Sequence, residues 1–408
     1  MKPKVCLTTL EFPPDIGGVG ESTHRIARML IDLGYDVHVA VFRAVFRTEK
    51  DRADKGDFGR SSCVTTEQDG ITVHRLFPAV RSTVARIQDY LCDIYGQLET
   101  LQRQHQFDLL HAFFINEMGF LTTLLAKENG IPVINSIRGA DLHKHVFSPQ
   151  QLAQVSWALE NSDWVTFVSQ DLMKRARVLV PQIASKSSAF LNSIYPISLE
   201  GLPKPKMLDR LKGTVIGSVG NFRDKKGLEY LFDACQNIQE QSEITLLFVG
   251  DFVGKEMGYW QKELANSNLT DRVVITGKIT REEALAYLPY MDIFAIPSLH
   301  DGCPNALLEA MMAQRAIVGT NVDAIGEILE DGINGLLVNP RSSEELERAL
   351  QQLISQPELR QKLGAVAQKT VFQKLNPEVE KQNWANIYQT ILDRPSSHNL
   401  ETPLALVG

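Results

Sequence analysis

The 408-residue sequence has few of the features that mark a specialised class of protein. Its five cysteines are odd in number, scattered and without a CxxC pair, so neither a disulfide framework nor a cysteine zinc site is expected. No apolar run approaches the roughly 18 residues that a membrane-spanning helix needs. The first residues contain too short an apolar stretch for a signal peptide. We therefore expect a cytoplasmic protein; peripheral membrane association is left open and is not predicted.

Positive charge is also scarce. The sequence has 42 Lys and Arg against 49 Asp and Glu, which gives a net charge of −7. A dedicated nucleic-acid binder carries a basic excess, so no nucleic-acid partner is expected. Hydrophobic residues make up 44% of the chain, which is ordinary for a globular protein, and the length indicates two or three domains.

Short apolar runs alternate with longer amphipathic stretches in two series. The predicted strands of the first series are Lys4–Leu10, Asp36–Phe42, Asp108–Phe114, Val133–Ile137 and Trp164–Ser169. Those of the second are Thr214–Gly220, Ile244–Gly250, Val273–Gly277, Asp292–Ser298 and Ala316–Thr320. The main predicted helices are Glu21–Leu33, Gly227–Gln239, Thr280–Met291, Asn305–Gln314, Ser342–Ser355 and Pro377–Leu392. Alternation of this kind predicts parallel sheets covered by helices on both faces.

Two segments interrupt the alternation. Residues 43–70 are charged and contain glycine, and are predicted to be a solvated surface excursion. The proline-containing segment that begins at Pro196 has little apolar periodicity and is predicted to be a linker. The sequence thus predicts a first domain at 1–196, a linker at 197–213 and a second domain at 214–374. Both domains are expected to be doubly wound, with ligands at the carboxyl ends of their strands.

The most informative stretch runs from Ile296 to Thr320. A buried strand is followed by a loop with an acid, Asp301, and then by Gly302, where the backbone can approach a ligand closely. Asn305 is predicted to cap the next helix, and the N–H groups of Asn305, Ala306 and Leu307 would face the loop. Such a helix start binds phosphate groups. Glu309, one turn further on, can accept two hydrogen bonds from vicinal hydroxyls. The alternative is a turn acid and a glutamate that only complements the helix dipole.

Basic side chains follow the first strand of the second series. Lys226, just before Gly227, can neutralise a diphosphate as a compact point charge. Arg223 either adds to this charge or belongs to a solvated turn, and we weigh the two equally. The loss of a diphosphate leaving group needs such charge stabilisation, which favours a phosphate contact for Lys226.

These motifs together resemble those of retaining glycosyltransferases with the GT-B fold, in particular glycosyltransferase family 4. The stretch around residues 297–311 matches the Pro-Ser, acid-Gly and Leu-Glu-Ala-Met pattern of that family, with Asp301 where glutamate is usual. Lys226 and Gly227 match the Lys-Gly of the family's basic loop, with Asn221 at its usual arginine position. The resemblance implies two Rossmann-like doubly wound domains that face each other across a cleft. It also implies a final helix, 375–394, that returns to the first domain before a polar tail, 395–408.

The resemblance assigns roles to individual residues. Predicted catalytic residues are Asp301, Glu309, Lys226 and Arg138. Glu309 would hold the nucleotide ribose. Predicted donor-binding residues are Gly17, Gly18, Asn221, Arg223, Lys226, Lys278, Asp301, Gly302, Cys303, Pro304, Asn305, Ala306, Leu307 and Glu309. Gly17 and Gly18 resemble the glycine loop after the family's first strand, and Lys278 follows a turn that contacts the base. Arg138 stands where many relatives carry histidine, and Arg138 and Asp141 are the candidates for acceptor binding.

The expected reaction is transfer of a hexose-type sugar from a nucleotide-sugar donor to an unidentified acceptor, with retention of anomeric configuration. No Asp-x-Asp motif is present to hold a divalent ion, so no metal and no other cofactor is expected. The acceptor could be a saccharide, a lipid-linked sugar or a small molecule. The alternatives are an epimerase or phosphorolytic enzyme on the same fold, and a catalytically silent protein that binds sugar nucleotides.

Overall fold

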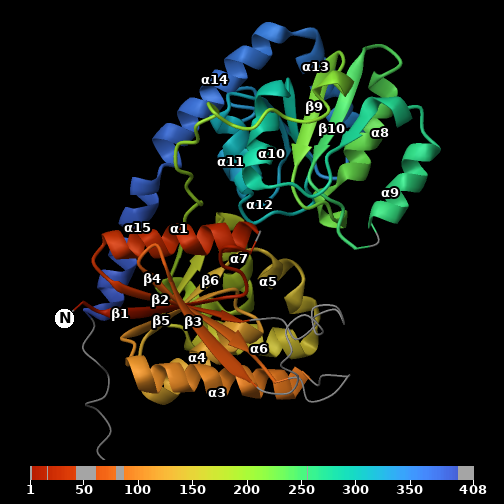
Figure 1. The fold of residues 1–408 in the computed structure, drawn as a ribbon. Coiled ribbons are helices and arrows are strands. Elements are labelled where there is room, and N and C mark those ends of the chain that lie inside the picture. Colours follow the sequence, from red (N-terminus) through yellow and green to blue (C-terminus); the bar gives the residue numbers. More distant parts are fainter. Residues whose placement is uncertain (1, 16, 43–60, 80–86, 255, 394–408) are drawn as a thin grey trace, which may run out of the picture. The chain divides into compact units, whose positions relative to one another are not determined.

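The computed structural model describes residues 2–15, 17–42, 61–79, 87–254 and 256–393. The chain divides into two compact units (Figure 1). Unit 1 comprises Met1–Phe190 together with Lys381–Gly408, and unit 2 comprises Leu191–Glu380. The division falls before Pro196, and the predicted linker at 197–213 is part of unit 2. Among the described residues, no helix is both long enough and apolar enough to cross a bilayer.

Unit 1 is built on a sheet with the strand order β3-β4-β2-β1-β5-β6-β7-β8. The strands are β1 (Lys4–Thr9), β2 (Asp36–Phe42), β3 (Ser62–Gln68), β4 (Ile71–Phe77), β5 (Leu109–Phe113), β6 (Val133–Ile137), β7 (Trp164–Phe167) and β8 (Ser187–Ala189). All neighbours pair in parallel except β3, which is antiparallel to β4. The buried residues of β1 alternate between the faces of the sheet, with Val5 and Leu7 in one core and Cys6 in the other.

Helices cover both faces of this sheet (Figure 1). They are α1 (Gly18–Asp32), α3 (Ile87–His105), α4 (Glu117–Asn129), α5 (Ala140–His143), α6 (Pro149–Asn161), α7 (Gln170–Leu179) and α15 (Pro377–Leu392). Trp384 and Tyr388 of α15 are fully buried in the core that α1 shares with β1 and β2. His111 of β5, which the sequence indicates is a core histidine, is buried and hydrogen-bonded to Tyr388 Oη at 2.8 Å and Ser136 Oγ at 2.7 Å.

Unit 2 contains a wholly parallel sheet with the order β11-β10-β9-β12-β13-β14. Its strands are β9 (Thr214–Val219), β10 (Ile244–Val249), β11 (Val273–Ile275), β12 (Ile293–Ile296), β13 (Ala316–Thr320) and β14 (Leu336–Val338). Successive residues of β12 alternate between two cores, with Ile293 and Ala295 in one and Phe294 and Ile296 in the other. A sheet buried on both faces is what near-continuous apolar strands of this kind require.

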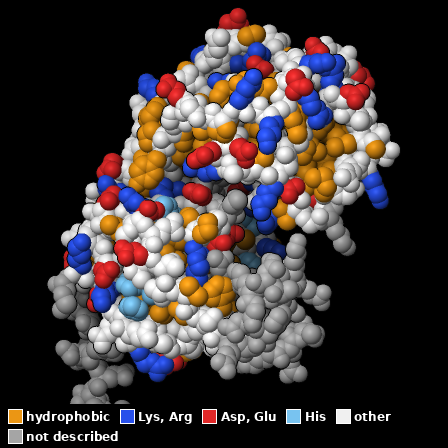
Figure 2. Space-filling model, in the orientation of Figure 1, with side chains coloured by type: hydrophobic (Ala, Val, Ile, Leu, Met, Phe, Trp, Pro, Cys, Tyr) orange, Lys and Arg blue, Asp and Glu red, His pale blue; other side chains and the backbone are white. Residues whose placement is uncertain are grey.

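Seven helices of the described residues surround the sheet of unit 2. They are α8 (Leu228–Ile238), α9 (Glu256–Ala265), α10 (Arg281–Tyr287), α11 (Asn305–Met312), α12 (Asp323–Ile328), α13 (Ser343–Ser355) and α14 (Pro357–Lys374). Leucines of α8 and α13 belong to one core and those of α10 and α11 to the other, so the unit has three layers. The visible surface of unit 2 carries acidic and basic side chains in a mixed pattern (Figure 2).

The prediction for residues 43–70 is wrong in part. Residues 43–60 lie outside the described residues, but Ser62–Gln68 form β3, the antiparallel edge strand of unit 1. Six of its seven residues are exposed, so side chains on both faces of this edge strand reach solvent and the strand has little apolar content. Composition alone therefore could not separate this strand from a surface loop.

Candidate active site

The strand order of unit 2 reverses between β9 and β12. β9 continues to β10 on one side of the sheet, and the chain returns to β12 on the other. Ligands of open α/β sheets bind beside such a reversal, at the carboxyl ends of the strands. The two loops that leave these ends are the ones that the sequence singles out: residues 220–227 after β9 and residues 297–304 after β12.

Gly227 fixes the loop after β9 against the loop after β12. Its φ of +60° is in the left-handed region, and a Cβ at this position would overlap the carbonyl oxygen of Pro297. The amide of Leu299 donates to the Lys225 carbonyl at 2.8 Å. The close contact of the two loops thus depends on a glycine at position 227.

Lys226 and Asp301 form an ion pair at this junction. Lys226 Nζ lies 2.5 Å from Asp301 Oδ2, and the two side chains are 20% and 12% exposed. The Asp301 backbone amide donates to Asp323 Oδ2 at 2.8 Å, which fixes the direction of the loop. The structure therefore brings together two predicted site residues that are 75 positions apart in sequence.

The neighbouring lysines keep the Asp301 carboxyl ionised. Burial on its own would raise the pKa of the Asp301 carboxyl, but the charges of Lys226 and Lys225 and the hydrogen bond from Lys226 outweigh burial and lower the pKa below its usual range. Burial lowers the pKa of the Lys225 ammonium. The carboxylate at the switch point is accordingly ionised, and two lysines lie beside it.

Helix α11 begins directly after this loop, and its N-cap residue differs from the predicted one. Pro304 is the N-cap residue and Asn305 is the first helical residue, so the prediction of Asn305 as the cap is wrong. Proline fits this place because it lacks the N–H that a helix start leaves unpaired. The amide of Leu307 donates to the Pro304 carbonyl at 3.1 Å, whereas the prediction left it free for a ligand. The amides of Asn305 and Ala306 are first-turn amides, which have no acceptor within the helix.

Glu309 is buried in α11 and forms an ion pair that the sequence analysis did not predict. Arg281, the first residue of α10, donates through Nε at 2.9 Å and Nη2 at 2.8 Å, both to Glu309 Oε1. The Glu309 side chain is 11% exposed and that of Arg281 is 49% exposed. A carboxylate held by a neighbouring cation counts against the predicted ribose contact.

The remaining predicted donor residues of unit 2 surround the same strand ends. Asn221, Arg223 and Lys278 are exposed, Gly302 and Pro304 are buried, and Cys303 is half-buried. Arg223 precedes the short 3-10 turn Asp224–Lys226. Lys278 follows β11 at the edge of the sheet, two strands away from β9. The structure therefore leaves Lys226, Asp301 and the start of α11 as the compact centre of the set.

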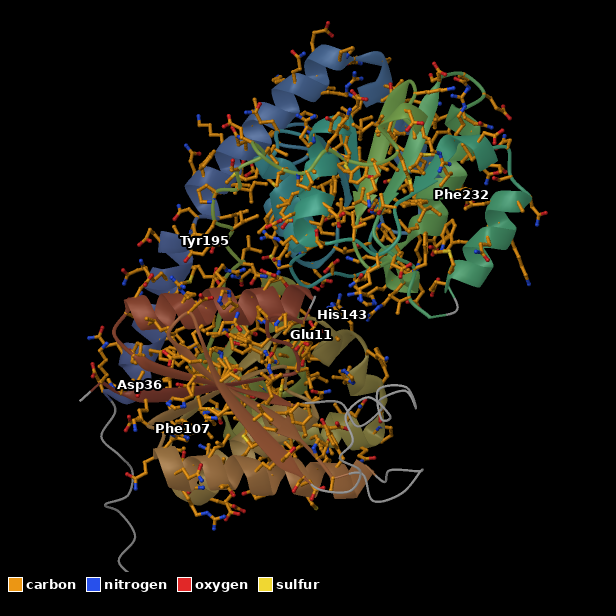
Figure 3. All side chains as sticks on the ribbon, in the orientation of Figure 1. Glu11, Asp36, Phe107, His143, Tyr195 and Phe232 are labelled. Carbon is orange, nitrogen blue, oxygen red and sulfur yellow. The ribbon has the colours of Figure 1, made fainter. Side chains whose placement is uncertain are left out.

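In unit 1, Gly17 and Gly18 lie where α1 begins, directly after β1 and its loop. Gly17 has extended backbone angles, and a Cβ there would overlap the Glu11 carboxylate. Figure 3 shows Glu11 beside the end of α1. The glycine therefore makes room for an acid that the sequence analysis missed. Because like charges repel, a carboxylate at this helix start disfavours a phosphate in the same place.

Arg138 and Asp141, the acceptor candidates, have different surroundings. The Arg138 guanidinium lies over the Phe113 ring, 4.8 Å from its centroid. Asp141 is fully buried and accepts from the backbone amides of Ile115 at 2.7 Å and Arg138 at 2.9 Å. Burial raises the pKa of Asp141, while these two hydrogen bonds lower it. The two Asp141 oxygens hold the backbone that follows β5 and the backbone that follows β6, which favours a structural function for this residue.

Family models of glycosyltransferases match a segment of each unit. Residues 213–356 match the family model described as "Glycosyl transferases group 1", and residues 17–184 match "Glycosyl transferase 4-like domain". The N-acetyl-alpha-D-glucosaminyl L-malate synthase of Bacillus anthracis is 22% identical over 402 residues, which cover 96% of this chain and 98% of that protein.

Solved structures show the same fold. The sucrose-phosphate synthase of Thermosynechococcus elongatus has a TM-score of 0.75 at 17% identity and covers 95% of this chain and 99% of its own. HepE of Anabaena in complex with UDP-glucose has a TM-score of 0.71 at 17% identity, with coverage of 95% and 99%. Fold and sequence thus define the class: the protein is a glycosyltransferase with the GT-B fold. Within that class it resembles glycosyltransferase family 4.

Proposed function

We propose that unit 2 binds a nucleotide-sugar donor at the carboxyl ends of β9 and β12, and that the enzyme transfers its hexose-type sugar with retention of configuration. The observation that carries this proposal is the Lys226–Asp301 pair at the strand reversal, beside the start of α11. The structurally similar HepE is described in complex with UDP-glucose, which supports a uridine donor as the first to test.

Each group at the strand reversal contacts a different part of the donor. Lys226 and the first-turn amides of α11 neutralise the diphosphate. Asp301 accepts from sugar hydroxyls and keeps Lys226 in place until the diphosphate arrives. Glu309 accepts from the ribose hydroxyls, with Arg281 moving aside or sharing the carboxylate. The backbone near Lys278 contacts the base.

The chemical step that we propose is a front-face displacement. The donor's C1–O bond to the diphosphate breaks, the acceptor oxygen bonds to C1 on the same face, and the departing phosphate takes the acceptor proton. Charge on the leaving diphosphate is stabilised by Lys226 and by the α11 amides. We propose that this step needs no divalent metal, because the fixed cation and helix amides supply that stabilisation.

We propose Arg138 as the acceptor contact in unit 1. A guanidinium supported on the Phe113 ring can form a paired hydrogen bond with a carboxylate or phosphate. An anionic acceptor fits the name of the Bacillus anthracis relative, which contains L-malate, a dicarboxylic acid. Asp141 is not part of this proposal, because its carboxylate holds backbone amides.

The experiment that tests the function is a donor screen followed by a product analysis. Nucleoside diphosphates and their sugars are ranked by thermal shift, and the best donor is incubated with anionic and neutral acceptors. We expect nucleoside diphosphate release that depends on an acceptor, and a product whose anomeric proton shows the donor's configuration by NMR. An inverted product would refute retention. Conversion of the donor sugar without any acceptor would identify an epimerase, and tight binding without turnover would identify a silent binding protein.

A further inference from the structure

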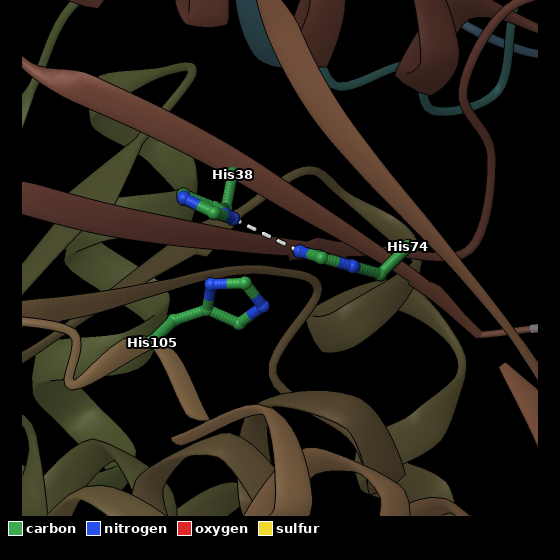
Figure 4. A group of neighbouring side chains, drawn as sticks. All are labelled: His38, His74 and His105. Atoms are coloured by element: carbon green, nitrogen blue, oxygen red, sulfur yellow. Dashed lines mark hydrogen bonds between the residues drawn. The ribbon is translucent and has the colours of Figure 1, made fainter. Parts of the chain in front are cut away.

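Three histidines of unit 1 converge on the face of the sheet that α3 covers (Figure 4). His38 lies on β2, His74 on the neighbouring β4, and His105 is the last residue of α3. In the parallel register of these strands, His74 is paired with Ala40, so the two strand histidines are diagonal neighbours. His38 and His74 are buried and His105 is partly exposed. The proposed transfer chemistry does not use these residues.

The ring nitrogens of the three histidines are close enough to share one ion. One ligand atom from each residue lies within 4.8 Å of the others, and His38 Nδ1 is 2.9 Å from His74 Nε2. Nitrogens that share a tetrahedral zinc ion at about 2.0–2.1 Å are separated by about 3.3 Å. The two strand histidines are thus near that spacing already. His105 ends its helix and needs only a small side-chain movement to reach it.

The outward-facing nitrogens of the strand histidines have oxygen partners. His74 Nδ1 is 2.9 Å from Thr65 Oγ1, and His38 Nε2 is 3.8 Å from Asp36 Oδ1. Metal-ligating histidines typically donate their second ring N–H to such an oxygen, which fixes the tautomer that points a lone pair at the ion. Only the Thr65 contact is within hydrogen-bond distance. His38 Nδ1 and His74 Nε2 are hydrogen-bonded to each other, so the proton between them moves to an outward-facing nitrogen when an ion binds.

Charged and aromatic side chains surround the cluster. Lys4, whose ammonium donates to the His105 carbonyl at 3.3 Å, opposes a cation, and the Asp36 carboxylate offsets it. Phe107 packs against the rings of His38 and His105 and limits access of water.

We propose that His38, His74 and His105 form a binding site for a single divalent transition-metal ion of the zinc type, with water as the fourth ligand. Imidazole nitrogens are preferred ligands of zinc, copper and nickel, and three histidines plus water is an established zinc arrangement. His38 lies near the amino end of β2 and His74 lies at the middle of β4, whereas the Gly17 loop follows the carboxyl end of β1. Figure 3 shows Asp36 and Phe107 at one end of unit 1 and Glu11 at the other. The ion therefore joins β2, β4 and α3 and stabilises unit 1, away from the loops proposed for sugar transfer.

Metal binding by the full-length protein tests this proposal directly. The chain is stripped with a chelator, dialysed against Zn²⁺, and analysed for bound zinc by mass spectrometry, with Co²⁺ as a spectroscopic probe of tetrahedral nitrogen ligands. We expect one ion per chain in the parent and loss of that ion in His105→Gln, which removes the least buried ligand. Thr65→Val should still bind the ion, but with an affinity lower by about 10-fold or more, because it removes the hydrogen-bond partner of His74.

His24→Gln is the matched control, since His24 is a partly exposed histidine of the same unit that pairs with Asp69. It should bind zinc as the parent does. Zinc should also raise the unfolding temperature of the parent and of His24→Gln, but not that of His105→Gln. A parent that binds no zinc, or a His105→Gln variant that binds it as tightly as the parent, would overturn the proposal.

Discussion

At the level of single residues, the sequence indicates candidate site residues but not the contacts between them. The sequence predicted Lys226, Asp301 and Glu309 as site residues, because each belongs to a short motif with a chemical meaning. It did not show that Lys226 contacts Asp301, because a contact across 75 positions depends on how two loops meet at the strand reversal. It also missed Arg281, which is the unremarkable first residue of a surface helix until the fold brings it to Glu309.

The Glu309–Arg281 pair yields a prediction at this scale. Glu309→Gln should weaken binding of UDP by roughly 1.5–3 kcal/mol, or about 10- to 100-fold, because a charged acceptor for the ribose is lost. Arg281→Met should leave the affinity within about threefold of the parent, since the proposal has Arg281 leaving or sharing the carboxylate. Isothermal titration measures both. Glu282 is an exposed acid on α10, the helix of Arg281, and Glu282→Gln is the control.

The alternative outcome for this pair is equally definite. If Arg281→Met weakened UDP binding as much as Glu309→Gln did, the carboxylate would serve to hold Arg281 and would not contact the ribose.

Helices and strands were predicted well where the apolar pattern is strong. Asp36–Phe42, Val133–Ile137 and Ala316–Thr320 are strands with the predicted bounds, since each is a short segment rich in β-branched residues. At the start of α10, Thr280 and Glu283 form a complete capping box. At Ser342 only half of such a box forms, because the Glu345 carboxylate accepts from Asn339 instead.

Other elements were not predicted from the sequence. Helix α14 buries Leu363, Gly364, Ala367 and Val371 and little else, so its apolar stripe is narrow. A helix with so few large apolar residues resembles a polar loop in sequence. Helix α3 was also not predicted, although Leu91, Ile94, Leu98 and Leu101 repeat at helical spacing and could have indicated it.

Gly227 provides a prediction at the scale of the loop. Gly227→Ala should destabilise the protein by about 1–3 kcal/mol, because an L residue is strained at φ +60° and its Cβ would overlap the Pro297 carbonyl. It should also weaken UDP binding by separating Lys226 from Asp301. Gly332→Ala has a similar φ of +70° with open space around it, so it should cost only the backbone strain and leave UDP binding unchanged. Urea denaturation and titration compare the two; equal effects on UDP binding would contradict the proposed loop contact.

In the whole molecule, unit 1 is built from two separate segments of the sequence, and unit 2 is the segment between them. Helix α15 begins within unit 2, yet its residues from Lys381 onward belong to unit 1. Trp384 and Tyr388 complete the core under α1, and Tyr388 hydrogen-bonds to His111. Unit 1 is thus incomplete until the final helix has been made. Periodicity predicted the helix itself, but its packing partner was an expectation from the family resemblance.

We expect Trp384→Ala to destabilise unit 1 by about 3–5 kcal/mol, as removal of a large buried side chain does. Hydrogen exchange followed by mass spectrometry should show faster exchange in β1 and β2, while β9 and β12 keep their protection. Phe372→Ala, at a half-exposed position on α14, should change neither. Faster exchange in β9 and β12 alone would contradict the assignment of this helix to unit 1.

The most direct measurement of the central claim is the affinity of the full-length protein for UDP, titrated in the parent, in Lys226→Ala and in Lys262→Ala. Lys262 is an exposed lysine on α9 of the same unit and controls for the loss of one positive charge. The account predicts that Lys262→Ala binds UDP as the parent does. Lys226→Ala should bind UDP with an affinity lower by about 10-fold or more, since a charged hydrogen bond to phosphate is worth roughly 1.5–3 kcal/mol. Equal affinity of the parent and Lys226→Ala would show that the diphosphate is not bound at the carboxyl ends of β9 and β12.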